Sequence, residues 1–179
     1  MVYPIVESIK NRAYATEVRV NFRKRALVII SIFCTVAIAV YLTGAGYQTY
    51  PVPSNSYSID VSVKTVIAGP ENWEVAFINF NYVDEGNHYY VLLNRDGTLE
   101  LTKVVNYEKQ FLSFVDTGLS PFYWHHFKIL NIGGEIHVYV DNTHYISLVD
   151  EMPFLGDFVL IGEVSAKLAF FKNAHVPKL

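Results

Sequence analysis

Acidic side chains are the residues of this sequence most suited to hydrolysis, and their placement argues against it. Cleaving a glycosidic bond needs two carboxylates that flank the bond, one acting as acid and the other as base or nucleophile. The acidic residues gather instead in predicted turns, at Asp84-Glu85, Asp150-Glu151 and Asp157, and no strand carries an alternating Glu-x-Asp-x-Glu pattern. We therefore predict no catalytic residues, and an enzyme related to glycoside hydrolases is the least favoured function.

Histidine and cysteine could bind a metal ion, but their spacing does not favour a site. The chain has six histidines and one cysteine, Cys34, and it lacks both helical HExxH and paired CxxC motifs. His125 and His126 are neighbours on one predicted strand, so their side chains point to opposite faces. We predict no metal and no cofactor, and the single cysteine excludes an intramolecular disulfide.

Amide and aromatic side chains on the predicted strands could bind a sugar. Aromatic rings stack on the faces of pyranose rings, and amides fix hydroxyl groups by hydrogen bonding. If the faces turned away from the core line one concave sheet, five side chains project together: Asn79, Asn81, Tyr89, His137 and Tyr139. The alternative is that these residues only stabilise cross-strand pairs. A register slip of one residue would redistribute all of them.

Short β-strands must position these side chains. After residue 56 the sequence shows apolar alternation interrupted by turn signals such as Asp96-Gly97 and Gly133-Gly134, a pattern typical of an all-β sandwich. We predict ten strands, at residues 57–66, 73–83, 88–94, 98–105, 108–115, 123–132, 135–141, 143–149, 157–163 and 166–176. The core-facing residues are predicted to include Ile59, Val61, Val63, Leu99, Leu101, Ile136, Val138 and Val140. Trp124 is also expected in the core.

The segment at residues 26–43 is predicted to be a transmembrane helix. Its 18 residues are uncharged and almost wholly apolar, and a helix of that length would span about 27 Å, close to the thickness of the hydrocarbon core. Arg23, Lys24 and Arg25 precede it, so the positive-inside rule places residues 1–25 in the cytoplasm and the rest of the chain outside. A cleaved signal peptide is the alternative, because small residues follow at 43–45. A retained signal anchor is the favoured interpretation.

Charge supports this division and excludes nucleic acid as a partner. The formal net charge is −3, but residues 1–25 carry six basic and two acidic side chains, so the remaining chain carries −7. Nucleic-acid binding requires a basic face, which the acidic main body does not offer. We predict a basic cytoplasmic segment at 1–25, the membrane anchor at 26–43, a Gly/Pro/Ser-rich linker at 44–56 and a β-sandwich at 57–179.

The motifs of residues 57–176 together resemble the laminin-G/concanavalin A-like jelly-roll family. The matching positions are Asn87, Tyr89 and Tyr90; Gly97, Leu99, Leu101 and Lys103; Trp124; Gly134 to Asp141; Gly156 to Gly162; and Phe171 to Val176. The resemblance implies a jelly-roll sandwich that binds carbohydrate or protein. Members of this family often hold calcium near a loop, and residues 84–87 are the only plausible loop for it in this sequence. The chain departs from the family in being short before its first strand, so either residues 47–56 supply a strand or an edge remains open for a partner strand.

These observations predict a membrane-anchored, extracytoplasmic binding module without catalytic activity. Its partners would be the lipid bilayer, through residues 26–43, and a glycan or an envelope protein, through the sandwich. The alternative is an accessory subunit of a larger membrane or cell-envelope complex. Fold alone does not decide between these functions.

Overall fold

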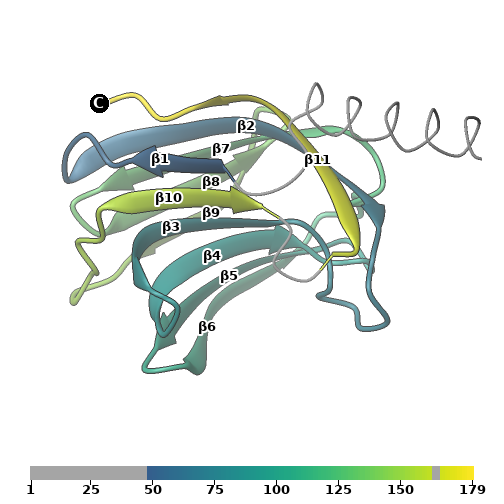
Figure 1. The fold of residues 1–179 in the computed structure, drawn as a ribbon, viewed down its shortest axis with the longest axis horizontal. Helices are drawn as coiled ribbons and strands as arrows, with labels where there is room; N and C mark the ends of the chain where they lie inside the picture. The colour runs from purple at the N-terminus through teal and green to yellow at the C-terminus, as the bar shows by residue number, and fades with distance from the viewer. Residues whose placement is uncertain (1–47, 163–165) are drawn as a thin grey trace, which may run out of the picture. The chain divides into compact units, whose positions relative to one another are not determined.

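Two antiparallel β-sheets pack face to face in this protein (Figure 1). The computed structural model describes residues 48–162 and 166–179, which form eleven strands and no helix. The six-stranded sheet has the order β1 (Gln48–Pro51), β10 (Phe158–Gly162), β3 (Phe77–Asp84), β4 (Asn87–Leu93), β5 (Thr98–Val105) and β6 (Glu108–Asp116). The five-stranded sheet has the order β11 (Leu168–His175), β2 (Ser56–Ile67), β7 (His125–Ile132), β8 (Glu135–Val140) and β9 (Thr143–Val149). The all-β sandwich predicted from the sequence is confirmed for these residues.

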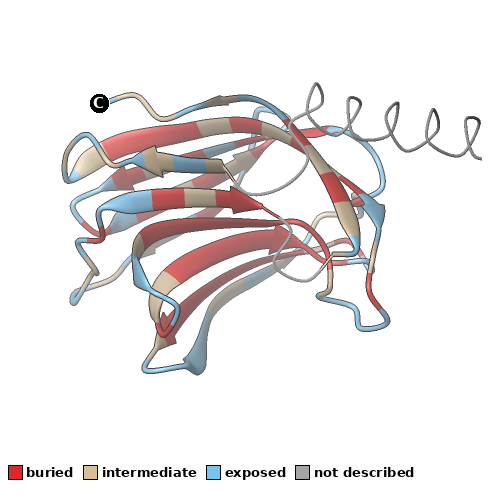
Figure 2. Cartoon of the chain, in the orientation of Figure 1, coloured by how far each residue is buried: buried red, intermediate tan, exposed pale blue. Residues whose placement is uncertain are grey.

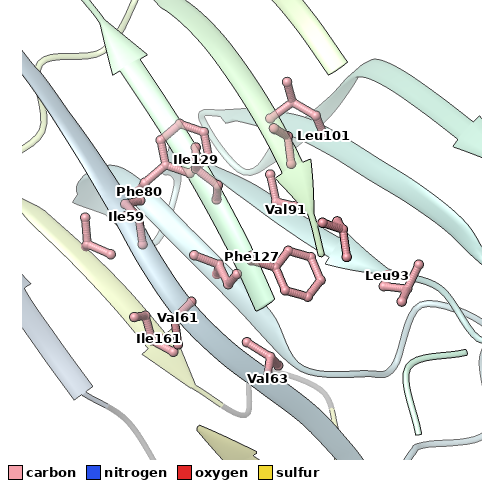
Figure 3. Close-up of a cluster of buried hydrophobic side chains, with 14 of the residues drawn as sticks. Ile59, Val61, Val63, Phe80, Val91, Leu93, Leu101, Phe127, Ile129 and Ile161 are labelled. Atoms are coloured by element: carbon pink, nitrogen blue, oxygen red, sulfur yellow. The ribbon is translucent and has the colours of Figure 1, made fainter. Parts of the chain in front are cut away.

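The main core lies between the two sheets, and we call the faces that form it the inner faces. Alternate residues of each strand enter this core because successive side chains of a strand point to opposite sides. Figure 3 shows Phe80 and Val91 of the six-stranded sheet among Ile59, Phe127 and Ile129 of the five-stranded sheet. The predicted core positions are all buried there: Ile59, Val61, Val63, Leu99, Leu101, Ile136, Val138 and Val140. Trp124 is an exception to the prediction, because it is 39% exposed.

Strand β1 lies within the segment predicted to be a linker. Gln48 pairs with Ile161 and Pro51 with Phe158, so residues 48–51 form the edge of the six-stranded sheet beside β10. The structure therefore selects the first of the two alternatives for the start of the sandwich, in which residues before 57 supply a strand. Proline is tolerated at this position because an edge strand needs ladder hydrogen bonds on one side only.

Two β-bulges break the alternation of the six-stranded sheet. In β3 the register with β4 shifts after Phe80, and Asn81 takes a positive φ of 45°. In β6 one extra residue, Leu112, separates Phe111, which faces Thr102, from Ser113, which faces Leu101. Each bulge places residues two apart in sequence on different faces, which simple alternation does not predict.

A buried ion pair joins the six-stranded sheet to the loop that follows β9. The Lys103 ammonium lies 2.8 Å from the Asp150 carboxylate, and the two side chains are only 9% and 14% exposed. Lys103 also donates to the Met152 carbonyl at 2.7 Å, and the Tyr89 hydroxyl donates to Asp150 at 2.5 Å. Partial burial alone would raise the pKa of Asp150, but the hydrogen bonds from Lys103 and Tyr89 outweigh it and lower that pKa.

The predicted cytoplasmic segment and membrane anchor, residues 1–25 and 26–43, lie outside the described residues. Within 48–162 and 166–179, no helix has the length and apolar character needed to cross a membrane.

Candidate functional site

The structure does not bring the five predicted ligand-binding residues together. Asn79 lies on the outer face of the six-stranded sheet, the face turned away from the core, where its amide donates to the Leu160 carbonyl at 3.4 Å. Asn81 and Tyr89 point into the sandwich. His137 and Tyr139 alternate with core residues of β8 and so lie on the outer face of the other sheet. The expectation of one shared face is therefore corrected.

Two physical causes separate these residues. The bulge at Asn81 turns its side chain inward, where its amide oxygen accepts a hydrogen bond from the Tyr57 hydroxyl and its amide nitrogen lies 3.4 Å from the Asn131 oxygen. Tyr89 is fully buried because it stacks on Phe80 and holds Asp150. Burial raises the pKa of both tyrosine hydroxyls, as expected for groups that serve as structural donors.

A cavity of about 310 Å³ opens on the outer face of the six-stranded sheet, and we call it the outer-face pocket. It lies over β4, β5 and β6 and beside the loop that precedes β3. Its lining residues are Asn72, Trp73, Tyr90, Asn94, Asp96, Thr98, Glu100, Lys109, Phe111 and Phe114. The volume falls at the lower end of the range of small-molecule sites, about 300–1,000 Å³.

The floor of the outer-face pocket holds a buried carboxylate. Glu100 is only 4% exposed, and its Oε1 accepts hydrogen bonds from the Tyr90 hydroxyl at 2.9 Å and the Thr102 hydroxyl at 2.8 Å. Its Oε2 accepts one long hydrogen bond, 3.3 Å, from the Asn94 amide. A carboxylate oxygen can accept more than one donor. Oε2 therefore has capacity for a hydroxyl or amine of a ligand.

Aromatic rings form the walls of the outer-face pocket. Trp73 is 38% exposed, and the Lys109 ammonium lies 4.2 Å from the centroid of its ring. Phe111 and Phe114 on β6 are 58% and 53% exposed, and their centroids are 5.3 Å apart. Exposed rings of this size are uncommon outside binding surfaces when they gather in one place. The walls therefore offer apolar contact, while the floor offers hydrogen bonds.

The rim is held in place by the turn between β4 and β5. The Asn72 amide donates to Asp96 at 2.9 Å, and the Asp96 amide donates back to the Asn72 oxygen at 3.0 Å. The Arg95 guanidinium donates to the Gly69 and Pro70 carbonyls at 3.2 and 2.9 Å. A hydrogen bond from the Thr98 amide is the first cause of the lowered pKa of Asp96. These contacts fix the loop that carries Trp73, so the pocket is formed before any ligand arrives.

A histidine–aspartate pair at the end of the five-stranded sheet has a structural role and not a catalytic one. His125 Nδ1 lies 2.6 Å from Asp141, while Nε2 lies 2.9 Å from the Ser120 carbonyl. A general base needs a ring nitrogen that faces the substrate. Both nitrogens of His125 are engaged with the protein, so this pair fastens residues 117–124 to the sheet.

Metal binding receives no support from the geometry. Among the residues that the structure describes, no three histidine, cysteine, aspartate or glutamate side chains converge to hold an ion. In the loop at residues 84–87, the one considered for calcium, Asp84 Oδ1 accepts hydrogen bonds from the Gly86 amide and the Asn87 side chain at 2.8 and 2.9 Å. These bonds close the turn between β3 and β4.

Sequence reasoning missed the residues of the outer-face pocket, although one signal pointed to them. Alternation in residues 98–103 already places Glu100 on the non-core side of its strand. The turn at Asp96-Gly97 predicts a hairpin in which β4 lies beside β5, the strand that carries Glu100. The bulge in β6 depends on its register with β5, and the loop that carries Trp73 is held against the β4–β5 turn by residues distant in sequence. No local sequence pattern predicts either feature.

Comparison with solved structures shows that the fold of the sandwich is similar to that of a carbohydrate-binding module and of galectins. The carbohydrate-binding module CBM66 from Bacillus subtilis aligns with a TM-score of 0.60 at 16% identity, over 75% of this chain and 83% of that one. The Caenorhabditis elegans galectin LEC-6 aligns with a TM-score of 0.55 at 16% identity, over 73% and 89%. Sheep galectin-11 gives 0.55 at 13% identity, over 74% and 98%.

These similarities show the fold and not the ligand, because all three identities are low. They agree with the jelly-roll sandwich that the sequence resemblance predicts. No protein-family model matches the sequence, and no curated protein matches it.

Proposed function

We propose that this protein is a non-catalytic carbohydrate-binding module whose ligand occupies the outer-face pocket. The observation that carries the proposal is the buried Glu100 carboxylate beneath the exposed rings of Trp73, Phe111 and Phe114. A sugar ring presents an apolar face to aromatic side chains and hydroxyl groups to polar ones, and the pocket supplies both. The fold shared with a carbohydrate-binding module and with galectins supports the same proposal.

Binding fits the two carboxylates of the outer-face pocket better than catalysis does. A glycosidase needs one carboxylic acid that holds a proton for the leaving group. The lowered pKa of Asp96 keeps that group ionised, and its two oxygens accept from Thr98 and Asn72. Glu100 is oriented by three donors of the protein. Both carboxylates therefore serve as fixed acceptors.

The test is binding of a fragment comprising residues 43–179 to immobilised neutral polysaccharides. Trp73→Ala removes a central ring and is expected to weaken binding roughly 30-fold, corresponding to about 2 kcal/mol for an aromatic hot spot. Glu100→Gln is expected to weaken it about 10-fold or more, because a hydrogen bond to a charged group contributes about 1.5–3 kcal/mol.

Trp124 offers a matched control for Trp73. It is 39% exposed, and the Lys172 ammonium lies 4.2 Å from its ring, so the two tryptophan–lysine pairs are alike. Trp124→Ala should leave glycan binding unchanged, because Trp124 is not among the residues that line the outer-face pocket. Equal losses in both variants, or no binding of the unaltered protein across a broad glycan panel, would contradict the proposal.

We infer further that residues 26–43 anchor the protein as a single-pass signal anchor, with residues 1–25 in the cytoplasm and the sandwich outside. The support is the uncharged apolar run directly after Arg23, Lys24 and Arg25. Protease added to intact cells is expected to remove the sandwich and to leave an N-terminal tag intact. Release of the chain by alkaline carbonate would contradict membrane insertion.

A further inference from the structure

Strand β6 is the free edge of the six-stranded sheet among the described residues. It pairs with β5 on one side and closes the strand order on the other. Its nine residues, Glu108–Asp116, are exposed at six positions. Figure 2 shows this strand largely in the colour of exposed residues, beside strands that are mostly buried. An edge of this length presents a row of unpaired backbone groups that can pair with another strand.

The side chains of β6 are divided between the two faces of the sheet by the bulge at Leu112. Lys109 and Phe111 face Val104 and Thr102 of β5, while Phe114 and Asp116 face Glu100 and Thr98. Those four β5 residues alternate with the core residues Leu99 and Leu101 and so lie on the outer face. As a result, two residues on each side of the bulge share the outer face: Lys109, Phe111, Phe114 and Asp116.

We propose that two copies of this chain pair antiparallel through β6, with the twofold axis between Leu112 and Ser113. In this register Lys109 of each copy lies opposite Asp116 of the other, and Phe111 lies opposite Phe114. The contact therefore contains two opposite-charge pairs and a cluster of four phenylalanine rings on one face. Both kinds of cross-strand pair stabilise antiparallel sheets.

Neighbouring registers are disfavoured by charge or by facing. Shifting the pairing by one residue in one direction sets Glu108 of each copy opposite Asp116 of the other, which gives two like-charge pairs. Shifting it in the other direction sets Phe111, on the outer face, opposite Val115, which packs against the core. Residues that lie opposite each other must point to the same face of a sheet, so only the proposed register satisfies both conditions.

Pairing through β6 joins two sheets of six strands into one sheet of twelve. Strands related by a twofold axis perpendicular to the sheet keep their outer faces on the same side. The two outer-face pockets, each walled by its own Phe111 and Phe114, then open in the same direction across the joint. A dimer of this form would present two ligand sites to one surface, which increases avidity for a repeating ligand.

The test is disulfide cross-linking of two full-length variants carrying Cys34→Ser, one with Lys109→Cys and the other with Asp116→Cys. The mixed sample is expected to form a cross-linked dimer on mild oxidation, because the two positions face each other. Neither variant should cross-link by itself. Residue 109 of one copy faces residue 116 of the other, so the two residues 109 are seven positions apart, or roughly 24 Å at about 3.4 Å per residue. A disulfide requires Cα atoms within about 7 Å.

Charge exchange supplies an independent measurement on the full chain in mild detergent. Asp116→Lys sets two like-charge pairs across the joint and is expected to lower the dimer association constant roughly 10-fold. Adding Lys109→Asp to the same chain restores opposite charges and should restore the dimer. The proposal is overturned if the mixed cysteine sample gives no cross-link, if either variant cross-links by itself, or if Asp116→Lys leaves dimerisation unchanged.

Discussion

The buried ion pair of Lys103 and Asp150 is expected to contribute strongly to the free energy of unfolding, and its geometry sets the size of that contribution. Replacing Asp150 by Asn keeps the shape of the side chain but removes the negative charge 2.8 Å from the Lys103 ammonium. The Lys103 side chain is 9% exposed, so its ammonium then has no anionic partner and keeps only neutral ones, among them the Met152 carbonyl and the faces of Phe154 and Tyr89, at 4.7 and 5.5 Å from their centroids. Breaking a buried ion pair by removing one partner costs about 3–5 kcal/mol.

We expect Asp150→Asn to lower the free energy of unfolding by about 3 kcal/mol at pH 7, the lower end of that range, because the Asp150 side chain is 14% exposed and water compensates in part. This is a large fraction of the roughly 5–15 kcal/mol typical of a domain. The assay is urea unfolding of fragment 43–179, followed by tryptophan fluorescence. In a Lys103→Met background the same substitution should cost less than about 1 kcal/mol, since no buried ammonium is left unpaired.

The pH dependence of this effect has a definite sign. The folded pKa of Asp150 is lowered, so its stabilising contribution is present above the unfolded value of about 3.9 and is lost as pH falls through the folded pKa. The difference between the wild-type protein and Asp150→Asn should therefore shrink below about pH 4. A difference that stays constant from pH 7 to pH 2, or an equal cost in the Lys103→Met background, would refute the ion-pair argument.

Three further predictions concern single positions of the sandwich. Gly97→Ala should cost more than Gly118→Ala in urea unfolding, because both glycines have positive φ but only at Gly97 would a Cβ lie 3.0 Å from a backbone oxygen, that of Leu119. On β7, Ile129→Ala should cost about 2–5 kcal/mol and Ile132→Ala less than about 1, since Ile129 is fully buried and Ile132 is 43% exposed. His88 has a pKa lowered by burial, so the stability of the folded protein should fall as pH drops from about 6.5 through the folded pKa. His88→Gln should flatten the dependence of the thermal unfolding temperature on pH in that range.

The sequence was sufficient to predict the faces of strands that are apolar on one side only, and it failed at Tyr89 because β4 is buried on both sides. Alternation in residues 135–140 identifies Ile136, Val138 and Val140 as core because strand geometry fixes that result locally. It also failed at Asn81, where a bulge reverses the facing of the side chain. A bulge depends on the register between two strands, and periodicity within one strand does not contain that information.

The candidate site was harder to predict than the fold, because its parts come from segments joined only in the folded chain. Asp96 and Glu100 lie on one predicted hairpin. The sequence correctly places Asp96 at its turn and Glu100 on its non-core face. Trp73 approaches them through hydrogen bonds between Asn72 and Asp96, residues 24 apart in sequence. Assigning all non-core faces to one concave sheet joined His137 and Tyr139 of β8 to Asn79 of β3, which belongs to the other sheet.

The two tryptophans show why position, and not residue type, identifies the site. Each is partly exposed, and each has a lysine ammonium 4.2 Å from its ring. Residue type, exposure and the lysine contact are alike for both, so none of these properties distinguishes a tryptophan that binds a ligand from one that only packs at the surface. Trp73 differs in that it stands over a pocket whose floor holds a buried carboxylate with a free hydrogen-bonding position, whereas Trp124 lines neither that pocket nor the smaller cavity beside Asn81. A sugar needs apolar and polar contacts at once. The register of β5 and β6 brings the rings of Phe111 and Phe114 to the same pocket as Glu100. We therefore base the proposal of binding on Glu100 as much as on the rings above it.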